Sequence, residues 1–248
     1  MLKVIDLSSV QGLPDWQAVV DDGIVGAYLK CTDGTKGKDP SYLYNYKNAS
    51  MRSVACGAYS FGQPSPAPGL SIEQDALAEV RHFFETSGGL GSSKGEMPPV
   101  LDLETAGGLT MDAVAKWARV WIEEAEQLWG VVPVIYTGLP MQAALRLIPT
   151  ATRCPLWVAA YPQYVVGQDK RGRDLYSKAI TWEQAATKSP PRIEPWAANG
   201  WTLWQFSGGM DNPQQLMPGN NVKGIKTWVD CNRFNGGERE WEAFARLA

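Results

Sequence analysis

The chain has 248 residues, of which 44% are hydrophobic and 20% are charged, so it is a folded protein of the size of a single α/β barrel. With 23 Lys and Arg against 26 Asp and Glu, the net charge is −3, and we expect no nucleic-acid partner. With His82 as the lone histidine, His-based zinc sites, Ser-His-Asp triads and Cys-His pairs are disfavoured, because each needs a well-placed imidazole. In an enzyme of this composition, carboxylates would carry the proton transfers.

The first residues predict a strand and not a secretory signal. Residues 1–6 contain no apolar signal segment and no small-residue cleavage site. No apolar run approaches the roughly 18–20 residues that a membrane span requires. We therefore expect synthesis in a cytoplasm without a signal peptide, and no insertion into a membrane.

Short β-branched and aromatic segments alternate with amphipathic stretches, which predicts a mostly parallel sheet covered by helices. Eight strands in a chain of this length favour an α/β fold with a single distorted (β/α) TIM-like barrel, and we expect residues 1–248 to form one domain. The expected strands are Val4–Ser8, Ile24–Thr32, Val54–Phe61, Val100–Glu104, Val132–Thr137, Leu156–Tyr161, Thr202–Ser207 and Thr227–Asn232.

Three helices are expected between and after these strands. Ser71–Glu85 begins with a capping box, Thr110–Trp129 carries an apolar stripe and ends before Gly130, and Glu238–Leu247 would close the bottom of the barrel. Two Gly- and Pro-rich stretches, 63–70 and 87–99, are predicted to be loops. The interval 162–200 is too long for a bare connection, so we expect a short helix or hairpin there, beside the site.

The four cysteines, Cys31, Cys56, Cys154 and Cys231, are scattered and show no metal-ligand or CxxC spacing. Strand alternation places Cys31, Cys56 and Cys231 on the face that the helices cover, where free cysteine behaves as a small hydrophobic residue. We predict reduced thiols, and we expect no metal and no cofactor.

Alternation also places two acids together. In residues 100–105, Asp102 and Glu104 share one face of the strand, whereas Leu101 and Leu103 share the other. In a barrel the leucines would pack under helices and the acids would point inward, near the strand end where barrel active sites lie. An antiparallel strand with one solvated face is the alternative interpretation of this segment.

Other strands direct polar or aromatic groups to the same mouth. Because residues i and i+2 share a face, these strands all contribute such groups, and a convergence of this kind indicates a functional site. The residues on the shared faces are Asp6 and Ser8; Tyr28, Lys30 and Thr32; Tyr59 and Phe61; Tyr136; Trp157 and Tyr161; Gln205; and Asp230 with Asn232.

Eight short segments then run in order along nearly the whole chain. They are DLSSVQG (6–12), KCTDG (30–34), GAYSF (57–61), LDLE (101–104), IYTG (135–138), WVAAY (157–161), WQFS (204–207) and VDCNRF (229–234). In this order they resemble the glycoside hydrolase family 25 lysozymes. The resemblance implies a distorted β/α barrel that cleaves the β-1,4 bond between N-acetylmuramic acid and N-acetylglucosamine in peptidoglycan.

The resemblance also implies roles for single residues. Glu104 matches the general acid, Asp102 its partner carboxylate, and Asp6 and Asp230 two further acids at the mouth. The expected substrate-binding residues are Tyr59, Tyr136, Trp157, Tyr161, Trp204 and Gln205, with Phe61 and Lys30 beside them.

Some of these residues have a structural alternative, and the chain departs from the family in places. In the structural alternative, Asp6 and Asp230 anchor loops and Trp157 and Trp204 belong to the core. Lys30 then pairs with a carboxylate at the mouth. Ser60 stands where the family often has His, and Asp33 where it often has Glu. The interval after Tyr161 is longer than is usual in the family, and it affects the edge of the groove and hence the details of the substrate.

The spacing of the two acids bears on mechanism. Acids at i and i+2 on one strand lie roughly 6.5–7 Å apart, which is longer than the ~5–5.5 Å of direct carboxylate attack and nearer the inverting range. Attack by the substrate's 2-acetamido group, oriented by Asp102, is a third route, and the resemblance favours retention by it. Neighbouring negative charge and apolar aromatic walls would raise the pKa of Glu104 and keep it protonated.

We therefore expect a monomeric muramidase whose partner is the peptidoglycan glycan strand. A phage-encoded lysin, released at lysis or carried in the virion, fits the absence of a leader. The alternative is a non-catalytic glycan-binding or structural virion barrel, which the presence of all four acids disfavours. A related chitin-cleaving hexosaminidase and a metal-dependent deacetylase fit the motifs and the single histidine less well.

Overall fold

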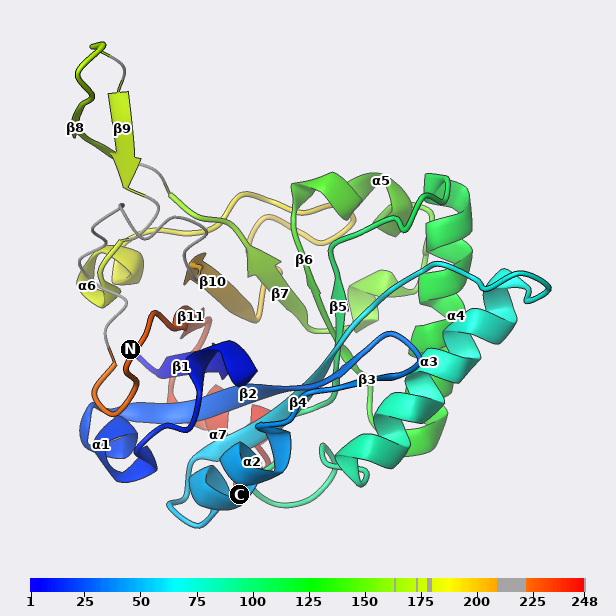
Figure 1. Cartoon of the computed structure of the whole chain (residues 1–248), viewed down its shortest axis with the longest axis horizontal. Helices are drawn as coiled ribbons and strands as arrows, with labels where there is room; N and C mark the ends of the chain where they lie inside the picture. The colour runs from blue at the N-terminus through cyan, green and yellow to red at the C-terminus, as the bar shows by residue number, and fades with distance from the viewer. Residues whose placement is uncertain (163, 173, 178–179, 209–221, 248) are drawn as a thin grey trace.

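A computed structural model describes residues 1–162, 164–172, 174–177, 180–208 and 222–247. Within these residues eight strands close into a barrel, in the order β1, β2, β4, β5, β6, β7, β10, β11 and back to β1 (Figure 1). The two-residue β3 (Gly37–Lys38) pairs with the end of β2. The barrel strands are β1 (Lys3–Leu7), β2 (Ile24–Asp33), β4 (Ala55–Phe61), β5 (Val100–Leu103), β6 (Val134–Thr137), β7 (Leu156–Ala159), β10 (Leu203–Ser207) and β11 (Asp230–Phe234).

The barrel is distorted at its last strand. Strand β11 runs antiparallel to both of its neighbours, β1 and β10, whereas the other neighbouring pairs of the barrel are parallel. This confirms the α/β class and the distorted TIM-like barrel. The antiparallel pairing sets Asp230 of β11 opposite Asp6 of β1.

A register shift in β2 corrects one prediction of alternation. Lys30 lies opposite Tyr59 on β4, but Thr32 lies opposite Ser60, so the shift falls at Cys31. Thr32 was expected to share the mouth-facing side with Lys30, and this is wrong. Its hydroxyl instead donates a buried hydrogen bond to Ser60 Oγ at 2.9 Å.

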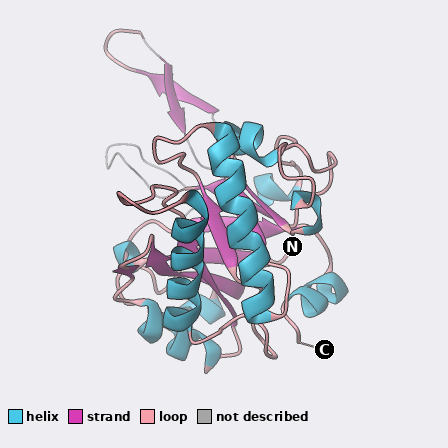
Figure 2. Cartoon of the chain, turned by 90° about the vertical axis from the view of Figure 1, so that its right-hand side faces the viewer, coloured by secondary structure: helices cyan, strands magenta, loops and turns pink. Residues whose placement is uncertain are grey.

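The predicted long helices form with their caps. The Ser71 hydroxyl accepts from Gln74 N, whose side chain accepts from Ser71 N in return, and α4 starts at a Thr110 cap and stops at Gly130 with a left-handed φ of 67°. Figure 2 shows the two longest helices, α3 and α4, side by side over the strands. The helices are α1 (Trp16–Asp21), α2 (Tyr42–Ser50), α3 (Ile72–Ser87), α4 (Met111–Trp129), α5 (Gln142–Leu145), α6 (Trp182–Ala186) and α7 (Glu238–Phe244), with 3₁₀ turns η1 (Ser9–Gln11), η2 (Leu139–Met141) and η3 (Ala151–Arg153).

Two apolar clusters divide the core. One lies between barrel and helices and includes Leu101 and Leu103, as alternation predicts. The other fills the barrel and includes Val100 and Trp241, the latter from α7. Gly26 leaves room for that indole, because a Cβ there would lie 2.5 Å from it. Helix α7 therefore closes the bottom of the barrel, as predicted, and leaves the opposite end for a site.

The interval 162–200 contains both elements that its length suggested. Strands β8 (Tyr164–Gln168) and β9 (Asp174–Ser177) form a hairpin that projects from the barrel (Figure 1). Helix α6 follows, and its Trp182 packs edge-on against Phe206 of β10 with ring centroids 5.0 Å apart. This contact attaches the interval to the barrel.

All four cysteines are free and buried, as predicted. Burial raises the pKa of Cys56 and of Cys154 to about 12, so both are protonated thiols at neutral pH. In the part of the chain that the structure describes, no helix has both the length and the apolar character needed to span a membrane.

Candidate active site

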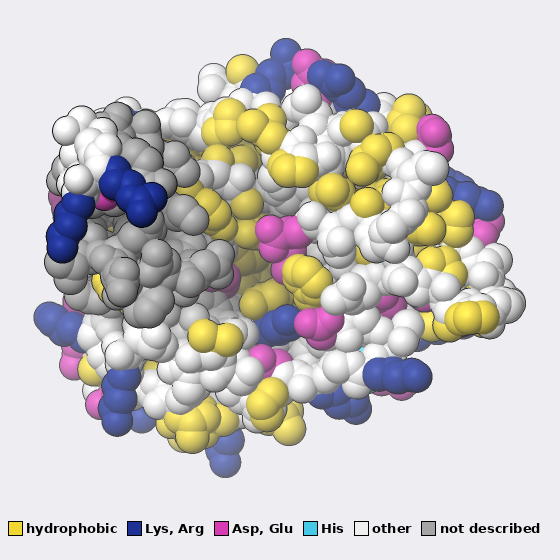
Figure 3. All heavy atoms as spheres, turned by 45° about the horizontal axis from the view of Figure 1, so that its top comes forward, with side chains coloured by type: hydrophobic (Ala, Val, Ile, Leu, Met, Phe, Trp, Pro, Cys, Tyr) yellow, Lys and Arg dark blue, Asp and Glu magenta, His cyan; other side chains and the backbone are white. Residues whose placement is uncertain are grey.

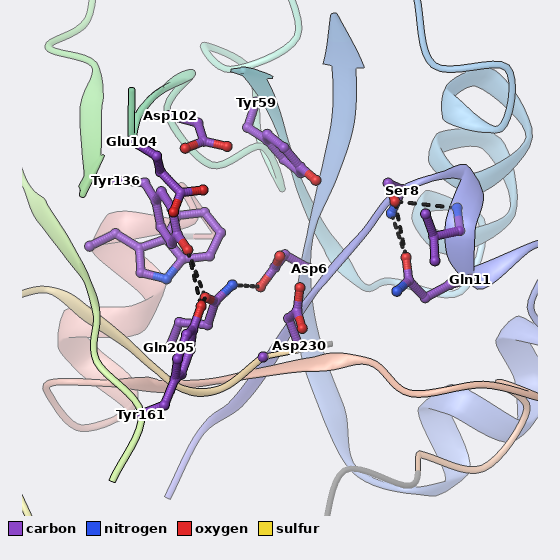
Figure 4. Close-up of a pocket in the computed structure, with 13 residues that line it drawn as sticks. Asp6, Ser8, Gln11, Tyr59, Asp102, Glu104, Tyr136, Tyr161, Gln205 and Asp230 are labelled. Carbon is purple, nitrogen blue, oxygen red and sulfur yellow. Dashed lines mark hydrogen bonds between the residues drawn. The ribbon is translucent and has the colours of Figure 1, made fainter. Parts of the chain in front are cut away.

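A hollow of about 400 Å³ opens at the mouth of the barrel, opposite α7. Figure 3 shows acidic side chains in a recess on this face, with hydrophobic side chains around it. Its lining comes from loops and strands far apart in the sequence (Figure 4). The lining residues are Asp6, Ser8, Val10, Gln11, Tyr59, Asp102, Glu104, Tyr136, Trp157, Tyr161, Gln205, Gly208 and Asp230.

Nine of the twelve residues expected at the site line this hollow. The four acids are among them, and so are four aromatic residues and one amide: Tyr59, Tyr136, Trp157, Tyr161 and Gln205. Three expected residues lie outside its lining: Lys30, Phe61 and Trp204.

Lys30 and Phe61 lie together at the ends of β2 and β4. Lys30 Nζ forms an ion pair with Asp33 Oδ2 at 2.8 Å and sits 5.0 Å from the centre of the Phe61 ring. Gln63 holds the other oxygen of Asp33 through its side-chain amide at 3.0 Å. Lys30 therefore pairs with a carboxylate, as the structural alternative for this residue expects.

Trp204 lies on the helix-covered side of β10, because alternation opposes it to Gln205. Its side chain is only 1% exposed, and its Nε1 donates to the Ala160 carbonyl at 2.7 Å. It lines a second hollow, which adjoins the first across Glu104 and Tyr161.

Asp102 and Glu104 form a close pair. Their carboxyls are within hydrogen-bonding reach of each other, closer than the roughly 6.5–7 Å that a regular strand gives. Strand β5 ends at Leu103, so the Glu104 side chain is not held in the pleat of the strand. Oδ1 of Asp102 is buried and meets no hydrogen-bond donor among the described residues.

The environment of this pair favours protonation. Burial, and then repulsion from Glu104 and Asp6, raises the pKa of Asp102 well above its usual range. Burial also raises the pKa of Glu104, which the Asp102 hydrogen bond and the charge of Lys30 lower in part. A hydrogen bond between two carboxyls needs one proton, so the pair retains a proton at higher pH than free carboxyls do.

Asp6 belongs to a second cluster of hydrogen-bonded polar side chains in the same hollow as the Asp102–Glu104 pair. Its Oδ2 accepts from Gln205 Nε2 at 2.9 Å and from Asn232 Nδ2 at 2.7 Å, and its carboxyl is also in reach of Asp230. Burial raises the pKa of Asp6 to about 6, against the lowering effect of these hydrogen bonds. Asp6 therefore changes charge close to neutral pH.

The aromatic wall is tied to the same amides. The hydroxyls of Tyr136 and Tyr161 both donate to Gln205 Oε1, the former at 2.7 Å. Trp157 Nε1 donates to Asn232 Oδ1 at 2.7 Å, and its ring meets Tyr136 edge-on at 4.8 Å. Each buried amide thus fixes both an aromatic residue and Asp6.

Sequence reasoning did not place every residue of the site. Asn232 was seen to share a face with Asp230 but was not assigned to the site. Ser8 was placed on the mouth-facing side of its strand but, like Gln11, was not assigned to the site. The two cap η1 reciprocally, with Ser8 N donating to Gln11 Oε1 at 2.9 Å, and their Ser-x-x-Gln spacing was the available signal for Gln11. Val10 and Gly208 carried no signal of their own.

Among the described residues, no three His, Cys, Asp or Glu side chains form a group that could hold a metal ion. The lining itself offers carboxyls for proton transfer beside an aromatic wall. Asp6, Asp102 and Glu104 all have raised pKa values, and such carboxyls gathered in one pocket are typical of sites of acid–base catalysis.

Comparison with known proteins gives consistent matches. Residues 5–214 match the family model described as Glycosyl hydrolases family 25. Lysozyme M1 of Streptomyces globisporus is 26% identical over 97% of this chain and 72% of its own length, and the N,O-diacetylmuramidase of Arthroderma benhamiae is 27% identical over 86% of each. The crystal structure of the bacterial lysozyme from Streptomyces coelicolor superposes with a TM-score of 0.74 and 24% identity, covering 100% of this chain and 98% of that one.

Proposed function

Since the chain belongs to glycosyl hydrolase family 25, we propose that it is a peptidoglycan muramidase, which hydrolyses the β-1,4 bond from N-acetylmuramic acid to N-acetylglucosamine. Two relatives over most of the chain bear the names lysozyme and N,O-diacetylmuramidase. The observation that carries the proposal is the close Asp102–Glu104 pair at the barrel mouth, where burial raises the pKa of both carboxyls.

Glu104 is the general acid of this proposal. It lines the hollow, so a glycosidic bond of a glycan strand bound there lies next to its carboxyl. When the glycosidic bond breaks, Glu104 gives its proton to the leaving oxygen of the next sugar. The raised pKa keeps that proton available.

Asp102 assists from the same wall. A close pair leaves no space for a sugar ring between its members, so Asp102 does not attack from the face opposite Glu104. In the proposed route the carbonyl oxygen of the 2-acetamido group forms a bond to the anomeric carbon as the glycosidic bond breaks. In this route Asp102, which lines the hollow, accepts the acetamido N–H. Water then opens the cyclic intermediate and gives a proton back to Glu104, so the configuration is retained.

The other residues shape the site around this chemistry. We assign Asp6 and Asp230 to negative charge near the developing oxocarbenium ion, since Asp6 reaches its charged form near neutral pH. Tyr59, Tyr136, Trp157, Tyr161 and Gln205 form the sugar-binding wall. Lys30 and Phe61, expected to bind substrate, act in this proposal at the rim, where the charge of Lys30 lowers the pKa of both Asp102 and Glu104.

The proposed substrate places the enzyme on the bacterial cell wall. The closed barrel holds all four acids, so we propose that residues 1–248 act as one catalytic unit. The phage setting, synthesis without a leader and the monomeric state stay predictions.

Analysis of the cut ends tests the proposal. Purified peptidoglycan is digested, reduced with borohydride and analysed by mass spectrometry. A muramidase leaves N-acetylmuramitol as the new reduced end, whereas N-acetylglucosaminitol would identify a glucosaminidase and contradict the proposal. Proton NMR of the first product tests the mechanism, because retention gives the β anomer and inversion the α anomer.

A further inference from the structure

The second hollow, of about 500 Å³, adjoins the acid pocket. Glu104 and Tyr161 line both, so a ligand group that leaves the acid pocket past these residues enters the second hollow. The rest of its lining comes from the segments after β6 and β7 and from the end of the interval 162–200. These residues are Gly138, Leu139, Pro140, Ala159, Ala160, Pro162, Ser189, Pro191 and Trp204.

The chemistry of this lining differs from that of the acid pocket. Glu104 is its charged residue, and the polar groups of Trp204 and Tyr161 are already bonded, to the Ala160 carbonyl and to Gln205. Ser189 is the remaining side chain with a hydroxyl. A sugar ring carries hydroxyls around its edge and loses hydrogen bonds to water in such a place. Methyl and methylene groups fit it better.

The outer wall of this hollow is fixed in place. Beyond Pro191, the backbone N–H of Glu194 donates to Gln142 Oε1 at 2.9 Å, and the Glu194 carboxylate pairs with Arg146. Trp196 is buried, and its Nε1 donates to the Cys154 carbonyl at 3.0 Å. These contacts hold the 189–196 segment against α5 and η3, so the hollow exists before any ligand arrives.

We propose that the second hollow binds the peptide stem that N-acetylmuramic acid carries on its lactyl group. This inference rests on the proposed function. Glu104 must meet the bond next to muramic acid, so the lactyl group of that sugar lies within one sugar width of Glu104. The lactyl methyl and the methyl of the alanine that follows it then pack on Leu139, Pro140 and Pro191, which are exposed in the hollow. The hollow thus selects glycan strands that carry their stems.

Two exposed positions allow a test that does not threaten folding. Leu139→Ser removes apolar surface from the hollow at a residue that is 54% exposed, and Ser189→Trp fills the hollow from an exposed residue. Leu147→Ser is the matched control, since Leu147 is 51% exposed and lies outside the hollow.

Each variant is assayed on stem-bearing peptidoglycan and on the same strands stripped of stems by an amidase. We expect Leu139→Ser and Ser189→Trp to lower the ratio of kcat/KM on stem-bearing over stripped strands about tenfold, and Leu147→Ser to leave it unchanged. An unchanged ratio in both variants would overturn the inference. So would an equal loss on both substrates, because the hollow would then hold sugar.

A binding measurement separates this inference from the proposed function. Titration with N-acetylmuramyl-L-alanyl-D-isoglutamine should give a Kd about tenfold higher for Leu139→Ser than for the unsubstituted protein. N-acetylmuramic acid without the peptide should show no such difference. An inactive enzyme would contradict the proposed function alone, whereas equal affinities for the muramyl peptide would contradict the stem site alone.

Discussion

Asn232 donates a hydrogen bond from Nδ2 to Oδ2 of Asp6 at 2.7 Å, across the antiparallel pair of β11 and β1. The same side chain accepts from Trp157 Nε1 at 2.7 Å. One amide therefore ties an acid of the pocket to its aromatic wall. The antiparallel strand that distorts the barrel supplies this amide together with Asp230.

Asn232→Ala should move the acid limb of the activity profile. Asp6 has a pKa of about 6, and the hydrogen bond from Asn232 lowers it, so its loss raises the pKa further. A group with a higher pKa takes up its proton at higher pH. We expect kcat/KM to fall below about pH 6 in the unsubstituted protein, and the limb to shift to higher pH in the variant, as a pH–rate profile would show.

The control for this measurement is Asn48→Ala, since Asn48 is half-buried on α2 and donates to the Tyr44 carbonyl outside the acid pocket. Its profile should match that of the unsubstituted protein. A limb that stays in place or moves to lower pH in Asn232→Ala would contradict the role given to this hydrogen bond.

Glu79→Gln should stabilise the fold at alkaline pH. Burial raises the pKa of Glu79 from 4.5 to about 8, so between these values the folded chain binds more protons than the unfolded chain. The free energy of unfolding therefore falls as pH rises through this window. Glutamine removes the titration and can still accept from Gln63 N, as Glu79 does. We expect a gain of at least ~1 kcal/mol at pH 8, about the value of one pKa unit.

Urea unfolding at pH 5 and pH 8 measures this difference. Glu85→Gln on the same helix is the control, because Glu85 is exposed. If the Glu79→Gln protein loses stability between the two pH values as steeply as the unsubstituted protein, the Glu79 carboxyl does not titrate in this range.

The cysteines should react only after unfolding. All four are free and buried, and burial raises the pKa of their thiols, so few thiolates are available to a thiol reagent. A colorimetric thiol titration without reductant should count four thiols in denaturant and close to none in the native protein. Two or fewer in denaturant would show a disulfide.

Much of the barrel follows from the regular alternation of strands. Predicted and observed strands overlap in all eight cases, and alternation placed Asp102 inward and the two flanking leucines under helices. It also opposed Trp204 to Gln205. The family resemblance placed Trp204 in the groove, and the structure keeps it on the helix-covered side of its strand.

The remaining features depend on contacts between distant segments. The register shift at Cys31 turned Thr32 away from the mouth, and nothing in the local pattern marks it. The direction of β11 depends on how the chain returns to β1. Glu104 lies just past the end of β5, so its approach to Asp102 could not be taken from strand spacing. The second hollow needs the interval 162–200 in place.

Turnover and binding of Glu104→Gln test the role of Glu104 as the general acid. Release of reducing ends from purified peptidoglycan gives turnover, and co-sedimentation with the same walls gives binding. We expect a loss of turnover of about 100-fold to 10,000-fold with binding kept, because glutamine preserves the shape of the side chain but has no proton to give. Turnover within a few-fold of the unsubstituted enzyme would contradict the assignment of Glu104 as the general acid.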